Sequence, residues 1–75
     1  MKHSDIILIF ESFGYHHEEA GHFIKHRGQA FATLIIRETG ISIKVYGSGY
    51  AESDFISSFN LTPENLLNWL KFNSI

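Results

Sequence analysis

The chain contains no cysteine, so neither a disulfide nor a thiolate metal site can stabilise its fold. A long apolar run is also missing, because Ile6–Phe10 is far too short to span a bilayer. No segment combines the length and the small-residue cleavage site of a signal peptide. These absences predict a cytoplasmic protein with no membrane partner.

An excess of basic charge is missing as well. Six basic and eight acidic residues are mixed along the chain and give a formal net charge of −2. Because no basic stripe is present, nucleic acid is a less favoured partner than protein. The five histidines can gain protons a little below neutral pH, and full protonation would change the net charge from −2 to +3.

The residues that are present are sufficient for one small core. Hydrophobic residues make up 44% of the chain and aromatic residues 15%, and a length of 75 residues indicates a single domain, 1–75. A domain of this size buries only about 60 to 65% of the surface of its unfolded chain. We therefore expect one α+β domain of modest stability.

The clearest signal for a strand pair lies between Gln29 and Tyr46, where the local and the long-range patterns agree. We expect a three-residue loop, Glu38-Thr39-Gly40, with Gly40 in the left-handed conformation. This loop predicts a register that pairs Arg37 with Ile41, Ile35 with Ile43 and Thr33 with Val45.

This register assigns the hairpin residues to two faces. The face packed on the helices is expected to be nearly all β-branched or aromatic: Phe31, Thr33, Ile35, Ile41, Ile43 and Val45. The mixed outer face would carry Ala32, Leu34, Ile36, Ser42, Lys44 and Tyr46. Because folding does not require an apolar outer face, we predict that four of its residues bind a partner: Leu34, Ile36, Lys44 and Tyr46.

The segment Ser4–Phe13 fits either a helix or a buried strand, because it contains five apolar residues in a row. We favour a helix, for which Ser4 is a good N-cap. Gly14 follows at the place where a left-handed residue ends a helix. Tyr15 is then positioned to contact Phe10, as in a Schellman motif.

The most polar segment, residues 15–22, is rich in histidine and glutamate and suggests a metal site. A zinc-protease helix needs two histidines four residues apart, and here His22 follows His17 one residue too late. We therefore expect a solvated loop, followed by a first strand over Phe23–Arg27. Metal binding and pH sensing are the alternatives for His16, His17, His22 and His26.

Glycines separate the expected strands. Gly28 ends the first strand and Gly47 ends the third, which predicts a three-stranded antiparallel meander. The run Gly47-Ser48-Gly49 lacks the lysine and the following helix of a phosphate-binding loop, so we interpret it as a flexible exit from the sheet. Beyond it, Phe55, Ile56 and Phe59 have the spacing of one helical turn.

The final segment carries the best-marked helix. Thr62 is the expected N-cap and Pro63 takes the first helical position. The apolar residues of this helix cover an arc of about 220°, wider than the roughly 100° stripe of a surface helix. Either Trp69 or Phe72 is exposed as an anchor for a partner, or Phe72 packs on the edge of the core. Both residues are included in the predicted partner-binding set.

Together these elements predict the order α-β-β-β-α, with both helices packed on one face of the sheet. This order resembles that of the double-stranded-RNA-binding domain. The Gly-Pro-x-His run of that family and the lysine-rich start of its second helix are missing, since here the helix opens with Thr62-Pro63-Glu64-Asn65. No binding residue is therefore carried over from the family.

Enzymatic activity is disfavoured, because a core this small leaves little room for a catalytic pocket. We predict no catalytic residue, no metal site and no cofactor; the only candidates for a catalytic set are His22 and His26 beside Glu18, Glu19 or Asp54. The leading hypothesis is a non-enzymatic protein-binding module that inhibits or regulates a larger protein or protein complex.

The small size and the lack of catalytic or targeting motifs are also typical of inhibitors encoded by phages and other mobile elements. Anti-CRISPR proteins, which mask host defence proteins, are one such type. The alternative function is nucleic-acid binding through the histidines and Lys25, Arg27, Arg37 and Lys44. Homodimerisation through the outer face is compatible with either class.

Overall fold

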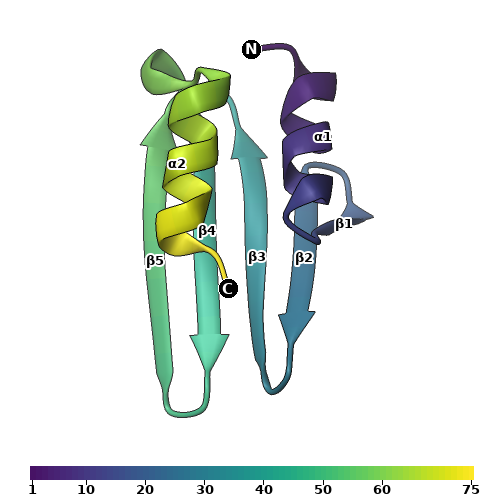
Figure 1. The fold of residues 1–75 in the computed structure, drawn as a ribbon, viewed down its shortest axis with the longest axis vertical. Coiled ribbons are helices and arrows are strands. Elements are labelled where there is room, and N and C mark those ends of the chain that lie inside the picture. The colour runs from purple at the N-terminus through teal and green to yellow at the C-terminus, as the bar shows by residue number, and fades with distance from the viewer.

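The computed structural model describes all residues, 1–75, and confirms an α+β domain with helix–strands–helix order (Figure 1). The sheet has five strands rather than the three expected. Neither helix has the length and apolar character needed to cross a membrane. In chain order the elements are α1 (His3–Ser12), β1 (His16–Glu19), β2 (His22–Arg27), β3 (Ala30–Arg37), β4 (Gly40–Gly47), β5 (Tyr50–Ser57), the 3-10 helix η1 (Ser58–Asn60) and α2 (Pro63–Asn73).

The two additional strands, β1 and β5, form the edges of the sheet, which has the order β1-β2-β3-β4-β5. All four residues of β1 are exposed, and so are the residues of β5 from Tyr50 to Phe55. An edge strand is held mainly by its backbone hydrogen bonds, so it needs no alternation of apolar and polar side chains. The expected loop at 16–19 and the expected helical turn at 55–59 were therefore wrong, apart from the short η1.

Every connection between strands is a tight turn of two residues: Ala20-Gly21, Gly28-Gln29, Glu38-Thr39 and Ser48-Gly49. Two-residue turns match the right-handed twist of the strands that they join. The whole sheet is consequently one continuous antiparallel meander, and Gly47-Ser48-Gly49 starts a hairpin instead of leaving the sheet.

The register predicted for the central hairpin was wrong by one residue. Its loop is Glu38-Thr39 alone, and Gly40 is the first residue of β4, opposite Arg37. Because side chains alternate between faces, this shift turns every β3 side chain to the other side of the sheet. The observed pairs on the helix side are Ala32 with Val45, Leu34 with Ile43 and Ile36 with Ile41.

Gly40 is needed for a close approach of strands rather than for closing a three-residue loop. Its φ of 150° is one that side chains rarely adopt. A Cβ at this position would overlap the carbonyl oxygen of Ile56 and lie 2.7 Å from the ring of Phe55. Gly40 therefore allows β5 to pair closely with β4.

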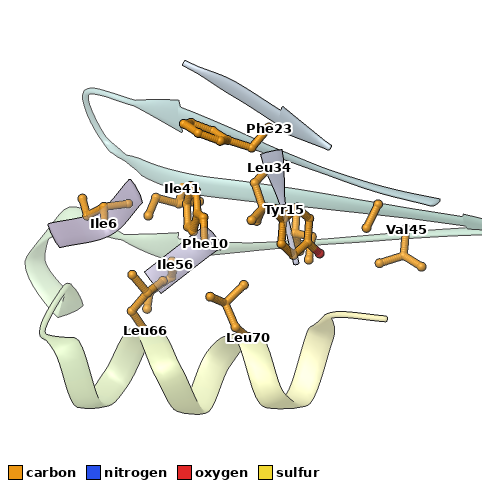
Figure 2. Close-up of a cluster of buried hydrophobic side chains, with 12 residues drawn as sticks. Ile6, Phe10, Tyr15, Phe23, Leu34, Ile41, Val45, Ile56, Leu66 and Leu70 are labelled. Atoms are coloured by element: carbon orange, nitrogen blue, oxygen red, sulfur yellow. The ribbon is translucent and has the colours of Figure 1, made fainter. Parts of the chain in front are cut away.

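Both helices cover the same face of the sheet, as predicted (Figure 1). α1 contributes Ile6 and Phe10 to the core, and α2 contributes Leu66 and Leu70. Figure 2 shows these side chains directed toward the apolar side chains of the sheet. The complete core is Ile6, Phe10, Tyr15, Phe23, Ala32, Leu34, Ile41, Ile43, Val45, Ile56, Leu66 and Leu70.

The end of α1 is the predicted Schellman motif. The amide of Gly14 donates to the carbonyl of Glu11, and the amide of Tyr15 donates to the carbonyl of Phe10. Gly14 has φ 90°, and the rings of Phe10 and Tyr15 lie 6.3 Å apart. The start of α1 differs from the prediction, because Lys2 rather than Ser4 is the N-cap and no side chain caps the helix.

The residues that follow α2 are held by Tyr15, which precedes β1, and by Lys25 of β2. The Tyr15 hydroxyl and Ser74 Oγ lie 2.8 Å apart, and Lys25 Nζ donates to the Ile75 carbonyl at 2.6 Å. Burial raises the pKa of Tyr15, and the hydrogen bond to Ser74 offsets part of this effect. These contacts connect α2 to β2 without any cysteine.

Candidate functional site

The face of the sheet opposite the helices, here called the outer face, is not covered by any other element. It consists of alternate residues of β2 to β5, and none of those that carry a side chain is buried. No aspartate or glutamate is among these residues of β2 to β5, and Glu19 of β1 adjoins His22 at the edge of the face. The outer face comprises His22, Ile24, His26, Phe31, Thr33, Ile35, Arg37, Ser42, Lys44, Tyr46, Ala51, Ser53, Phe55 and Ser57.

An aromatic row crosses one end of the outer face. Phe31 and Tyr46 are directly opposite on β3 and β4, and their rings stack with centroids 4.6 Å apart and planes inclined by 17°. The ring of His26 lies 5.9 Å from the ring of Phe31. Such cross-strand aromatic pairs stabilise a sheet and hold one another in place. The row therefore forms a preorganised apolar surface.

Beside the aromatic row lies a hollow of about 600 Å³ over β3, β4 and β5. Tyr46, Ile35 and Phe55 form its apolar walls. Phe55 is 46% exposed, which is unusual for a phenylalanine in the middle of a hydrogen-bonded strand. Three hydroxyl-bearing residues also line the hollow, namely Thr33, Ser42 and Ser53.

Two cations and one carboxylate line the hollow. Arg37 and Lys44 both line it and both are exposed. Arg37 Nε donates to Ser42 Oγ at 3.2 Å, which fixes the direction of the guanidinium. Asp54 borders the hollow, but its carboxylate accepts hydrogen bonds from Trp69 Nε1 at 3.2 Å and from the Phe55 amide at 2.8 Å. Neither cation forms an ion pair within the chain, whose one salt bridge joins His22 and Glu19.

Two of the predicted partner-binding residues lie on the outer face, Lys44 and Tyr46. The placement of Leu34 and Ile36 on that face was wrong, because the register turns both toward the helices. Leu34 is 0% exposed and belongs to the core, and Ile36 is half-buried against it. A partner could reach Leu34 only by displacing the helices that cover it.

The other two predicted residues lie on the helix side of the molecule. Trp69 is half-buried against the core and donates its indole hydrogen to Asp54. Phe72 is 89% exposed, so it does not pack on the edge of the core. Since both residues belong to α2 on the helix side, the structure does not bring them together with Lys44 and Tyr46.

The sequence interpretation did not place Phe31, Ile35 and Phe55 at the candidate site. Phe31 and Ile35 were assigned to the core because they are β-branched or aromatic, which suits either face of a sheet. Phe55 was assigned to a helical turn. The repeated turn signals at Gly21, Gly28 and Gly49 could have indicated the meander and its two-residue turns.

The cations proposed for nucleic-acid binding are divided between the two faces. Arg37 and Lys44 lie on the outer face, whereas Lys25 and Arg27 alternate onto the helix side. Lys25 is also held by its hydrogen bond to Ile75. The five-stranded order further removes the resemblance to the double-stranded-RNA-binding domain, which depended on three strands.

The histidines do not converge on a metal site. His22 and His26 share the outer face with Ile24 between them, and His22 Nδ1 lies 3.8 Å from Glu19 Oε1. No group of three or more histidine, aspartate or glutamate side chains is arranged to hold a metal ion.

The fold and the outer face together define a small α+β domain with one open sheet surface. Comparison of the chain with protein-family models, with curated protein sequences and with solved structures finds no match. The geometry of the outer face is therefore the feature of this chain that indicates a function.

Proposed function

We propose that this chain is a non-enzymatic protein-binding module that uses its outer face to inhibit or regulate a larger protein in the cytoplasm. The observation that carries the proposal is the uncovered face of β2 to β5, which holds Phe31, Ile35, Tyr46 and Phe55. These apolar side chains lie on both sides of a polar row, Thr33, Lys44 and Ser53, and exposed aromatic side chains grouped on one face are typical of a protein interface. Rigid aromatic side chains also lose little conformational entropy on binding.

The aromatic geometry favours protein over nucleic acid as the partner. Single-stranded nucleic acid binds by stacking its bases on free aromatic ring faces. Here Phe31 and Tyr46 stack on each other, so each covers one face of the other ring. The outer face also has only Arg37 and Lys44 as permanent cations, too few for strong attraction to a phosphate backbone.

The surroundings of the hydroxyls support a non-enzymatic function. A nucleophilic serine requires a base within hydrogen-bonding distance. Ser42 Oγ accepts its hydrogen bond from Arg37, which cannot act as a base at neutral pH. Binding that covers a site on a larger protein needs no chemistry, and a phage-encoded inhibitor of the anti-CRISPR type would act in this way.

Site-specific photo-crosslinking tests the proposal. A photo-reactive phenylalanine analogue at Thr33, on the outer face, should capture a protein from host lysate in a defined stoichiometry. The same analogue at exposed Asn68 on α2 is the matched control and should capture at least about tenfold less of it.

Substitutions provide the second arm of this test. Tyr46→Ser should reduce capture by at least about tenfold, while Phe72→Ser, which removes an exposed aromatic from the helix side, should leave it unchanged. Equal capture from Thr33 and Asn68, or loss of capture only in Phe72→Ser, would contradict the proposal.

A further inference from the structure

The hollow on the outer face combines positive charge with apolar walls, and this combination defines the chemistry of its occupant. We propose that the hollow receives an acidic segment of the partner protein, with an aspartate or glutamate side chain pairing with Lys44 and Arg37. An aromatic or aliphatic side chain beside that carboxylate would contact Tyr46 and Phe55. The inference rests on the proposed function and specifies the partner's chemistry.

The distribution of charge on the outer face indicates an acidic partner. The whole chain has a net charge of −2, yet the β2 to β5 part of the outer face has two permanent cations and no acidic residue; the one acidic neighbour, Glu19, lies at the β1 edge beside His22. The acidic residues of β5, Glu52 and Asp54, alternate onto the helix side of the sheet. A surface of one sign in a chain of the opposite net sign selects a partner of complementary charge.

The position of Lys44 indicates where the partner's carboxylate binds. It lies opposite Thr33 on β3 and Ser53 on β5, in the middle of the outer face. Any partner that covers this face must therefore remove Lys44 from water. Burial of a cation without a counter-charge is strongly unfavourable, so the partner has to supply a carboxylate at this point.

The same position disfavours a second copy of this chain as the occupant. In a symmetric dimer the same patch of both copies would meet. Both copies would then bury Lys44, and the acidic residue that each copy has on this side, Glu19, lies at the β1 edge beside His22 rather than near the centre of the face. An acidic protein partner satisfies the charge that a homodimer would leave unpaired.

The hydrogen bond of Arg37 leaves its guanidinium able to bind a carboxylate. Its Nε is already engaged by Ser42 Oγ at 3.2 Å, and its terminal nitrogens have no partner within the chain. A guanidinium held in this way can bind both oxygens of a carboxylate through its two terminal nitrogens. The volume of about 600 Å³ has room for one or two side chains.

A pair of small probes tests the inference without knowledge of the partner. Phenylacetate carries a carboxylate beside an aromatic ring, and phenylacetamide has the same shape without the charge. In ¹⁵N–¹H correlation spectra, about 20 mM phenylacetate should shift the amide signals of Ser42, Lys44 and Ser53 in a saturable way. Phenylacetamide should shift them at least about threefold less.

Substitutions of two lysines show where phenylacetate binds. Lys44→Met should weaken phenylacetate binding by at least about threefold, whereas Lys71→Met, at an exposed lysine of α2, should leave it unchanged. Equal shifts with phenylacetate and phenylacetamide, no shifts with either, or stronger shifts with a decathymidine oligonucleotide would overturn the inference.

Partner capture distinguishes the inference from the proposed function. Lys44→Arg should preserve capture and Lys44→Glu should abolish it if the partner supplies a carboxylate. If Tyr46→Ser abolishes capture but Lys44→Glu does not, the proposed function stands and the acidic occupant is wrong. If neither substitution affects capture, the proposed function fails, and the inference fails with it.

Discussion

Phe31 and Tyr46 lie directly opposite each other on β3 and β4, and their rings stack on the outer face 4.6 Å apart. The same pairing places Leu34 opposite Ile43 on the helix side. A single two-residue turn therefore determines which side chains form the core and which form the candidate binding surface.

The register predicts a large difference in stability between two neighbouring substitutions. Leu34→Ala should lower the free energy of unfolding by about 2–5 kcal/mol, because it leaves a cavity in the core. Ile35→Ala should cost clearly less, about 1–2 kcal/mol, because Ile35 is only half-buried on the outer face and its loss leaves no closed cavity. Urea unfolding followed by circular dichroism measures both. A larger loss for Ile35→Ala would support the three-residue loop instead.

Gly40 and Gly28 should respond differently to alanine. Gly40→Ala should destabilise the domain by more than about 2 kcal/mol, because the new Cβ overlaps the Ile56 carbonyl oxygen. Gly28→Ala places its Cβ in open space and costs only the left-handed backbone conformation, about 1–2 kcal/mol. Thermal unfolding of the two variants compares them directly. Equal losses would show that β5 does not pass as close to Gly40 as described.

The caps of the two helices provide a third comparison. Thr62→Ala should cost about 0.5–2 kcal/mol, because Thr62 Oγ1 accepts a hydrogen bond from the Asn65 amide at 3.2 Å. Ser4→Ala should have little effect, because Ser4 lies inside α1 and caps nothing. Chemical denaturation of each variant against wild type gives both values. A cost for Ser4→Ala similar to that for Thr62→Ala would restore Ser4 as the cap of α1.

Tyr15 should make the domain less stable in alkali. Its pKa in the folded state is raised above the ordinary value of 10.0, chiefly by burial. The folded state therefore binds the phenolic proton more tightly than the unfolded state does. The resulting stability is complete below pH 10 and is lost as the pH rises through the folded pKa. Urea midpoints measured from about pH 8 to pH 11 should fall in wild type.

The control for this prediction is Tyr15→Phe, which removes the titrating group together with its contact to Ser74. Its urea midpoint should be lower than that of wild type at neutral pH but should fall less between pH 9 and pH 11, values set by the ordinary tyrosine pKa of about 10. An identical alkaline decline in both proteins would assign the effect to other groups.

Much of the architecture could be predicted because it depends on local chemistry. Thr62 and Pro63 marked the start of α2, and Gly14 with Tyr15 marked the Schellman end of α1. The covering of one sheet face by both helices also followed from the apolar stripes of the helices. The strands β1 and β5 could not be found in this way, because their exposed side chains have no apolar period and their pairing is made by the backbone.

For the candidate site, sequence reasoning identified Lys44 and Tyr46 but grouped them with the wrong neighbours. The pattern of β3 is apolar on both faces, so it is compatible with either register. The observed two-residue loop therefore places Leu34 in the core and Phe31 on the surface, whereas the predicted three-residue loop placed Phe31 in the core and Leu34 on the surface. No residue within β3 alone could decide between these arrangements.

The sequence by itself determined that these 75 residues form a small α+β domain in which one helix precedes and one helix follows an antiparallel sheet, because caps, glycines and helical periodicity act over a few residues. Only the tertiary structure decided which face of β3 the helices cover. That choice depends on β5 pairing closely beside Gly40 and on both helices packing against Leu34 and Ile43. These are contacts between segments distant in the chain, and they place Phe31 and Tyr46 together with Lys44 on the open side of the sheet.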